Sequence, residues 1–227
     1  VVAANAGSDY LFVPDGNIDT VKAAVTSLQS RLQFGAMFVS DRYGEIPGTL
    51  PMSLIKTESS ANGRAPDIIV SFSFDESVDV AGKSGVSYAS SINRRGDHGS
   101  FSPTDTHISL MARGPDFKSG LHDPLPKANV DIAPTVARIL KFSMPDAQGR
   151  VLEEALQGGP PITEYAVVSK THRSSIRTGL TVKLPTDLDG LTVDPKLSSY
   201  SVELKTKILT RGAASYTYFD QAKAVRE

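Results

Sequence analysis

The chain has 227 residues, of which 40% are hydrophobic and 22% are charged, and its formal net charge is −1 at pH 7. A chain of this length and composition can bury a core without metal or disulfide staples. The absence of cysteine excludes disulfides, thiolate metal sites and cysteine nucleophiles. The balanced charge, without a basic stripe, gives no case for a nucleic-acid partner. No run approaches the roughly 20 apolar residues that a membrane span requires.

The chain opens on an apolar run, Val1-Val2-Ala3-Ala4, which predicts a buried strand. A core strand at the very start leads us to expect further sequence upstream. If residues upstream are missing, the sequence gives no evidence about a signal peptide or other targeting segment.

The next elements alternate between strand and helix. Residues 10–13 form a short apolar strand, and turn residues follow at 14–17. Asp19 or Thr20 is expected to cap a helix that ends near Gly35, with apolar residues at helical spacing: Val21, Ala24, Val25, Leu28 and Leu32. Residues 36–39 form a buried strand. Strand–helix–strand order predicts an α/β layered fold.

The middle of the chain combines long loops with short elements. Residues 43–66 and 75–105 are rich in small and polar residues and predict excursions, with a strand at 67–74 between them. Residues 106–112 predict a strand with Ile108 and Leu110 on one face.

Two helices and a run of strands complete the chain. A helix follows Asn129, with Ile132, Val136, Ile139 and Leu140 on one side. A short helix at 151–156 ends at the Gly-Gly-Pro-Pro run of 158–161. Alternating residues in 160–227 predict antiparallel strands with turns at 186–187 and 211–212. The predicted division is therefore 1–158, an α/β domain, and 159–227, a β-rich segment.

The segment Gly96-Asp97-His98-Gly99-Ser100 is the first candidate for chemistry. Glycine lets the backbone approach an ion or ligand without a Cβ clash, and a neutral imidazole binds zinc-like metals well. On its own, a histidine in a glycine-rich loop is more often solvent-facing or hydrogen-bonded than a metal ligand.

Two later segments make the motif around His98 more specific. Residues 112–118 read Ala-Arg-Gly-Pro-Asp-Phe-Lys, and residues 129–135 read Asn-Val-Asp-Ile-Ala-Pro-Thr. Together the three segments resemble the closing stretch of the type I phosphodiesterase/nucleotide pyrophosphatase family of the alkaline phosphatase superfamily. Residues 4–9, 46–51 and 149–156 are also similar to bacterial members, so the resemblance covers most of 1–156.

The resemblance implies a partial alkaline-phosphatase-like layered sheet followed by a C-terminal antiparallel β-rich segment. It also implies a hydrolase of small-molecule phosphate esters that uses two zinc-like divalent metal ions in the intact enzyme. His98 matches a metal ligand of the family. Asp97 is not assigned a metal, and we interpret it as a loop carboxylate or one that holds the imidazole.

The family places its Ser or Thr nucleophile and most metal ligands before the region seen in this chain. The resemblance therefore implies that the chain contains no catalytic nucleophile, that its partner is a missing N-terminal half of the same protein, and that it is inactive alone. The family resemblance favours a periplasmic or secreted location for this protein. Three alternatives stay open: a non-catalytic binding or assembly module with the half-fold, a fragment that pairs with an N-terminal piece, and a homo-oligomer.

The remaining candidates have plainer interpretations. Gly82-Lys83-Ser84 lacks the earlier glycine of a phosphate-binding loop. We expect a structural ion pair at Asp41-Arg42. The other histidines are expected to be structural or solvated, and the aromatic residues near His98 either stack on a leaving group or pack the loop. These residues are His107, His122 with Asp123, His172 with Arg173 and Arg177, and the aromatic residues Tyr88, Phe101 and Phe117.

Overall fold

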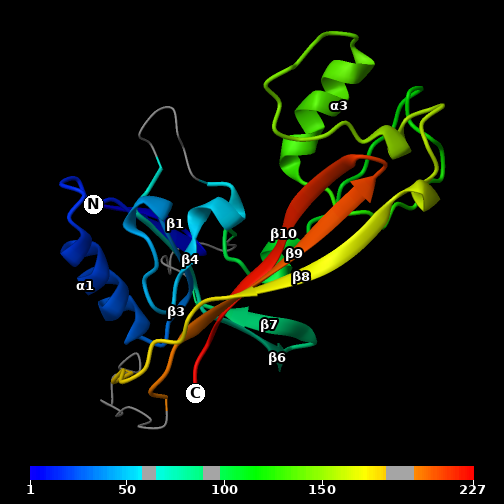
Figure 1. Cartoon of the computed structure of the whole chain (residues 1–227). Coiled ribbons are helices and arrows are strands. Elements are labelled where there is room, and N and C mark those ends of the chain that lie inside the picture. Colours follow the sequence, from blue (N-terminus) through cyan, green and yellow to red (C-terminus); the bar gives the residue numbers. More distant parts are fainter. Residues whose placement is uncertain (58–64, 89–97, 183–196) are drawn as a thin grey trace. The chain divides into compact units, whose positions relative to one another are not determined.

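The structure is a computed structural model that describes residues 1–57, 65–88, 98–182 and 197–227 (Figure 1). It is a mixed α/β chain with several sheets, more strands than helices, and two compact units. Unit 1 contains Val1–His107, Thr171–Lys205 and Gln221–Glu227, and unit 2 contains Ile108–Lys170 and Thr206–Asp220. The predicted division at 158–159 stays a prediction, as does the alkaline-phosphatase-like sheet.

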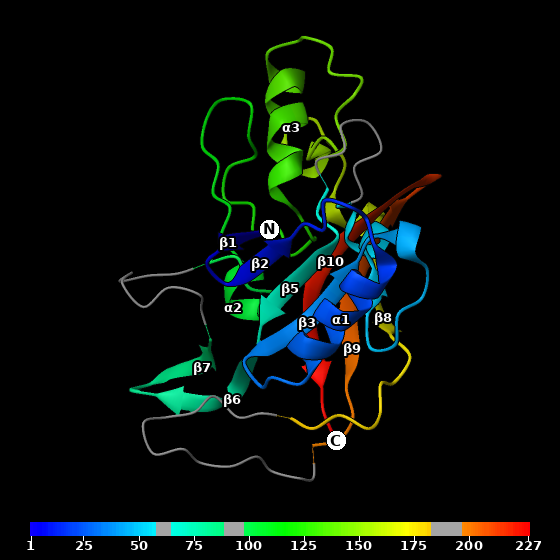
Figure 2. The same ribbon diagram turned by 90° about the vertical axis from the view of Figure 1, so that its left-hand side faces the viewer.

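A five-stranded sheet forms the core of unit 1 (Figure 2). Its order is β1 (Val2–Asn5), β2 (Ser8–Leu11), β5 (Ile68–Phe72), β3 (Phe34–Val39) and β4 (Leu50–Pro51). The pairs β1–β2, β2–β5 and β3–β5 are antiparallel, and β3–β4 is parallel. The predicted strands at 36–39 and 67–74 are confirmed, because β3 and β5 are apolar runs that are buried on both faces.

Helix α1 (Ile18–Gln29) connects β2 to β3, which lie on either side of β5, antiparallel to it and therefore parallel to each other. Its cap is Asn17, whose side chain accepts hydrogen bonds from the amides of Asp19 and Thr20. The predicted cap at Asp19 or Thr20 is therefore wrong, because the Asn17 side chain already satisfies the amides of these first-turn residues.

The predicted strand at the chain start forms, but its predicted burial is wrong. Strand β1 lies at the edge of the sheet, and Val1 and Val2 are 80% and 61% exposed. An apolar run is equally compatible with an edge strand, so the sequence pattern does not decide burial.

The predicted loop at 75–105 contains regular structure. Strands β6 (Phe74–Val80) and β7 (Lys83–Ser87) form a hairpin, and the two turn residues Ala81 and Gly82 both have positive φ. Such a turn matches the twist of paired strands. A short helix, α2 (Pro103–Thr106), follows.

The 3-10 helix η1 (Asp41–Tyr43) leads into the excursion at 43–66, whose described residues form strand β4 and a second 3-10 helix, η2 (Met52–Ile55). The predicted strand at 106–112 is absent. Ile108, Leu110 and Met111 are exposed there, and none of the described residues pairs with the segment as a strand.

Unit 2 is built around α3 (Ile132–Ile139). It follows η3 (Asn129–Asp131) and is accompanied by η4 (Glu153–Ala155) and η5 (Ile162–Glu164). The helix forms where it was predicted, and it buries Pro134, Thr135 and Ala137. Of the apolar stripe that defined it in the sequence, Ile132, Val136 and Leu140 are between 43% and 64% exposed, and Ile139 is half-buried.

The C-terminal strands form a three-stranded sheet in the order β10 (Ala214–Val225), β9 (Ser201–Arg211) and β8 (Ala166–Arg173). Each strand contributes residues to both units. The hairpin turn predicted at 211–212 is confirmed at Gly212, where φ is 56°. Leu180 and Val182 are buried but lie outside the strands, and the predicted turn at 186–187 falls outside the described residues.

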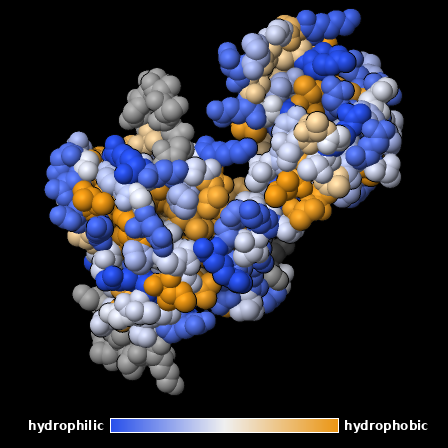
Figure 3. Space-filling model, viewed as in Figure 1, coloured by the Kyte–Doolittle hydropathy of each residue, from blue (hydrophilic) through white to orange (hydrophobic). Residues whose placement is uncertain are grey.

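No helix in the described part of the chain is long and apolar enough to cross a membrane. On the face shown in Figure 3, apolar side chains are interspersed with polar ones in both units.

Candidate functional site

His98 lies at the start of a loop that packs against the turn between β1 and β2. Its side chain is exposed, and its carbonyl accepts a hydrogen bond of 2.8 Å from the amide of Gly7. Gly96 and Asp97 lie outside the described residues, so the interpretation of Asp97 stays a prediction.

Two glycines allow this contact between backbones. A Cβ on Gly7 would lie 2.3 Å from the amide nitrogen of Ser100, and a Cβ on Gly99 would lie 2.9 Å from the Asn5 carbonyl oxygen. Gly99 also has a φ of 91°, which L side chains rarely adopt. The structure therefore joins 4–9 to 98–100, two segments that the sequence linked only through the family resemblance.

Buried hydroxyl groups fix the rest of the loop. The Ser100 amide donates to the Asp105 carboxylate at 2.9 Å, and the hydroxyls of Ser100 and Ser102 are 2.8 Å apart. The Phe101 amide donates to the Ser71 hydroxyl at 2.9 Å. These serines are at most 5% exposed. Their hydroxyls are engaged in holding the loop, so we assign none of them as a nucleophile.

Gly7→Ala is expected to lower the free energy of unfolding by about 1–3 kcal/mol, because the new methyl group cannot fit against the Ser100 backbone. Ala6→Gly is the matched control in the same turn. Ala6 has a φ of 62°, so glycine relieves strain there while adding chain entropy. Chemical unfolding of both variants measures the difference. Equal stabilities would contradict the close contact between the two segments.

Asp9 is a carboxylate on this part of the sheet that the sequence analysis did not single out. One carboxylate oxygen of Asp9 is buried without a hydrogen-bond partner among the described residues. Burial raises the pKa of Asp9 above its ordinary value, although the Asn5 amide opposes the shift. In the sequence Asp9 directly precedes the predicted strand at 10–13, and no local pattern marks it as partly buried.

The donor set of the described residues does not fit a complete two-metal centre. Within 1–57, 65–88, 98–182 and 197–227, no three or more His, Asp or Glu side chains are grouped so as to hold a metal ion. A catalytic zinc ion takes about three protein ligands. His98 is thus one candidate ligand, and no reaction step can be derived from these residues.

The other family-like segments meet in unit 2, where they build a buried ionic network. The guanidinium of Arg150 forms a bidentate ion pair with Glu154, at 2.6 and 2.7 Å, and its Nε donates to the Tyr218 hydroxyl at 2.7 Å. Arg150 is 4% exposed and Glu154 is fully buried. Burial would raise the pKa of Glu154, but the hydrogen bonds and charge of Arg150 outweigh it and lower that pKa.

Asp131 connects the segment 129–135 to the segment 149–156. Its carboxylate accepts hydrogen bonds from the Arg150 amide at 2.8 Å, the Ala128 amide at 2.9 Å and the Tyr218 hydroxyl at 3.0 Å. The hydroxyl of Thr135 accepts from the Leu152 amide at 3.0 Å. In this structure the acidic and hydroxyl groups of both segments hold unit 2 together.

The Gly-Pro-Asp-Phe-Lys turn has a similar role. The ammonium group of Lys118 donates to the carbonyls of Gly159 and Pro160 at 2.9 and 3.0 Å, and Phe117 pairs with Leu156 in an isolated β-bridge. The turn therefore packs against the segment 156–160 within unit 2.

Several of the remaining candidate residues from the sequence also have structural roles. Arg42 forms its ion pair with Asp67 rather than with Asp41, and the Tyr43 hydroxyl donates to the same carboxylate at 2.6 Å. Phe101 packs edge-on against Phe38, with ring centroids 5.6 Å apart. Tyr88 and His122 are exposed, Asp123 forms a largely buried ion pair with Lys127, and the exposed Arg173 pairs with Glu203.

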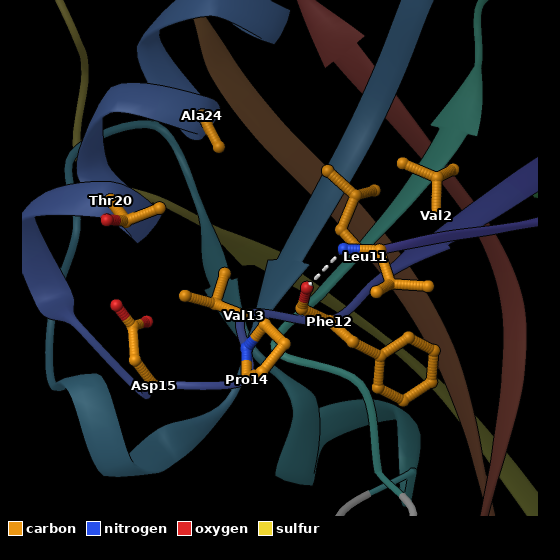
Figure 4. A pocket seen from close by; sticks show the side chains of 9 residues that line it. Val2, Leu11, Phe12, Val13, Pro14, Asp15, Thr20 and Ala24 are labelled. Carbon is orange, nitrogen blue, oxygen red and sulfur yellow. Dashed lines mark hydrogen bonds between the residues drawn. The ribbon is translucent and has the colours of Figure 1, made fainter.

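Unit 1 also contains two open cavities. One, of about 510 Å³, is mainly apolar and lies beside the start of β1, the end of β2 and helix α1, with the lining residues Val1, Val2, Leu11, Phe12, Val13, Pro14, Asp15, Thr20 and Ala24 (Figure 4). The other, of about 430 Å³, lies at the carboxyl ends of β3 and β4, and Asp41, Glu45 and Arg173 are among its lining residues. Ligands of α/β sheets often bind at such strand ends.

Searches of protein-family models, of curated proteins and of solved structures found no match to this chain.

Proposed function

We propose that this chain is the C-terminal portion of a metal-dependent hydrolase of phosphate esters, and that His98 supplies one ligand to its metal site. The observation that carries the proposal is the contact of the His98 loop with the β1–β2 turn through Gly7 and Gly99. It fixes the backbone of residue 98 against the β1–β2 turn, which would support an exposed imidazole as a metal ligand. The resemblance supplies the rest, including the substrate class and two zinc-like ions.

In this proposal most of the catalytic groups belong to the N-terminal half that the resemblance implies. They would supply the nucleophile and the remaining metal ligands, since His98 alone cannot hold an ion usefully. The buried network around Arg150 then has a supporting role, which is to keep unit 2 folded.

The test is the metal content and activity of the natural full-length protein. His98→Ala is expected to lower bound zinc, measured by plasma mass spectrometry. The variant is also expected to lower kcat/KM on bis(p-nitrophenyl) phosphate by about 100-fold or more, since even residues that only support a ligand can cost this much. His122→Ala, at an exposed position in the other unit, is the matched control.

Unchanged zinc content and turnover in His98→Ala would show that His98 is not a metal ligand. A folded full-length protein that binds no zinc and hydrolyses no phosphate ester would instead favour the non-catalytic binding or assembly module.

A further inference from the structure

The C-terminal strand β10 contacts the loop that carries His98. The Ala222 amide donates to the Phe101 carbonyl at 3.1 Å, and the Phe101 amide donates to the Ser71 hydroxyl on β5 at 2.9 Å. Both backbone groups of Phe101 are thus bonded to strands that lie far apart in the sequence. Ala222 is only 1% exposed, so water cannot readily replace the Phe101 carbonyl as the acceptor of its amide.

Asp105 holds the same loop from helix α2. Its carboxylate accepts a hydrogen bond from the Ser100 amide at 2.9 Å, and its own amide donates to the Ser102 carbonyl at 3.1 Å. A hydrogen bond to a carboxylate is roughly twice as strong as one between neutral groups. Asp105 is therefore expected to hold the residues after His98 more firmly than the neutral groups of the loop do.

The position of His98 depends on these two attachments. The contact of His98 with the β1–β2 turn is a backbone hydrogen bond, from the Gly7 amide to the His98 carbonyl at 2.8 Å. A hydrogen bond between neutral groups contributes only modestly to net stability. Because Gly99 alone separates His98 from Ser100, the contact with Gly7 is expected to persist only while the residues after it are held in place.

We propose that Asp105 and the Ala222 amide are positioning groups of the candidate site, which hold His98 against the β1–β2 turn. The end of β10 is then part of the support of the site, although it is far from His98 in the sequence. This role rests on the proposed function, because the position of His98 matters to the chemistry only if His98 is a metal ligand. The contacts themselves require no metal ion, so they can be tested on this chain.

Hydrogen exchange of the Gly7 amide, followed by NMR, measures the contact. In the unmodified chain this amide is expected to exchange faster than the Ile69 amide of the central strand β5, because the loop can open without unfolding the sheet. Asp105→Ala is expected to speed Gly7 exchange by about 10-fold or more, the effect of losing a hydrogen bond to a charged group. Asp105→Asn is expected to stay within about threefold of the unmodified rate, since its neutral amide oxygen still accepts. Tyr200→Phe lowers the stability of unit 1 elsewhere and is expected to leave the Gly7 rate unchanged.

A backbone ester tests the contribution of β10. Lactic acid in place of Ala222, introduced by nonsense suppression, removes the amide donor and keeps the side chain, so Gly7 exchange is expected to rise by about 3–10-fold. Lactic acid in place of Ala224, whose amide makes no hydrogen bond to the loop in the described part of the chain, is the matched control.

An unchanged Gly7 rate in Asp105→Ala, or in the ester at position 222, would overturn the role of that group. Equal acceleration in Tyr200→Phe would show that the contact opens only when the whole unit unfolds, and both roles would then be wrong. The exchange rate is measured without metal. Failure of the positioning role is therefore distinguished from failure of the hydrolase proposal, which His98→Ala tests through zinc content.

Discussion

Arg150→Ala is expected to lower the free energy of unfolding at pH 7 by about 3–5 kcal/mol, the usual cost of leaving one partner of a buried ion pair alone. Glu154 would then be a fully buried carboxylate without its guanidinium, and the Tyr218 hydroxyl would lose its 2.7 Å donor. Denaturant unfolding followed by circular dichroism measures the change.

The pH dependence of stability gives a second test, because lowering the pH is expected to have opposite effects on the unmodified protein and on Arg150→Ala. In the unmodified protein the pKa of Glu154 is lowered, so its contribution is present above the unfolded-state pKa and is lost as pH falls through the folded-state value. In Arg150→Ala, burial is no longer outweighed and the folded pKa rises. The variant is therefore expected to gain stability from pH 7 toward pH 5, where the carboxyl group becomes neutral.

A double variant separates the ion pair from packing. Arg150→Met with Glu154→Met removes both charges and keeps much of the buried volume. It is expected to recover most of the lost stability, since apolar replacements of buried ion pairs are often neutral or stabilising. A double variant as unstable as Arg150→Ala would show that the network supplies more than charge balance.

Tyr200→Ala is expected to cost about 3–5 kcal/mol, the range for truncation of a large aromatic residue in a core. Tyr200 is fully buried in unit 1, and its hydroxyl donates to the Gly35 carbonyl on β3. The guanidinium of Arg226 lies 4.7 Å from the ring centroid and donates to the carbonyls of Gln29, Arg31 and Phe34, which lie between the last residue of α1 and the first residue of β3. The truncation therefore removes packing beneath the helix terminus as well.

Tyr200→Phe is the matched control. It keeps the ring and its contact with Arg226 but leaves the Gly35 carbonyl without its donor, at a cost of about 1–2 kcal/mol. Thermal and denaturant unfolding of both variants give the comparison. If Phe destabilises as much as Ala, the hydroxyl rather than the ring packing is the dominant contribution.

The parts of the fold that could be predicted from the sequence are those with a strong local pattern. The strands β3 and β5 are continuous apolar runs, and α1 and α3 have apolar residues at helical spacing. Such patterns indicate that an element exists. They do not indicate what covers it, and for this reason β1 and the apolar stripe of α3 are exposed where burial was the natural expectation.

The errors lie where distant residues decide the structure. The β6–β7 hairpin has few apolar residues, and the sequence predicted only a loop there. The segment 106–112 has a strand-like pattern but no partner strand among the described residues, and a strand without a partner has unpaired backbone groups.

For the candidate site, the sequence identified His98 and the family-like segments. It could not show which residues of these segments belong to a site and which stabilise the fold. Asp131, Arg150 and Glu154 lie in the family-like segments 129–135 and 149–156, and in the structure they form the ionic network of unit 2. Asp9 was not singled out within the segment 4–9, because its burial arises from pairing with β5, which no local pattern indicates. Only the fold brings such residues to their partners.

The discontinuity of unit 1 has a consequence for biosynthesis. Residues 1–107 leave the ribosome first, but Tyr200 and the final segment Gln221–Glu227 complete the same unit. At roughly 5–20 residues per second, the interval between the two ends is on the order of ten seconds. During that time the site for Tyr200 is unfilled and the end of α1 lacks Arg226. The growing chain therefore displays apolar surface that a holdase chaperone would cover until translation reaches the last strand.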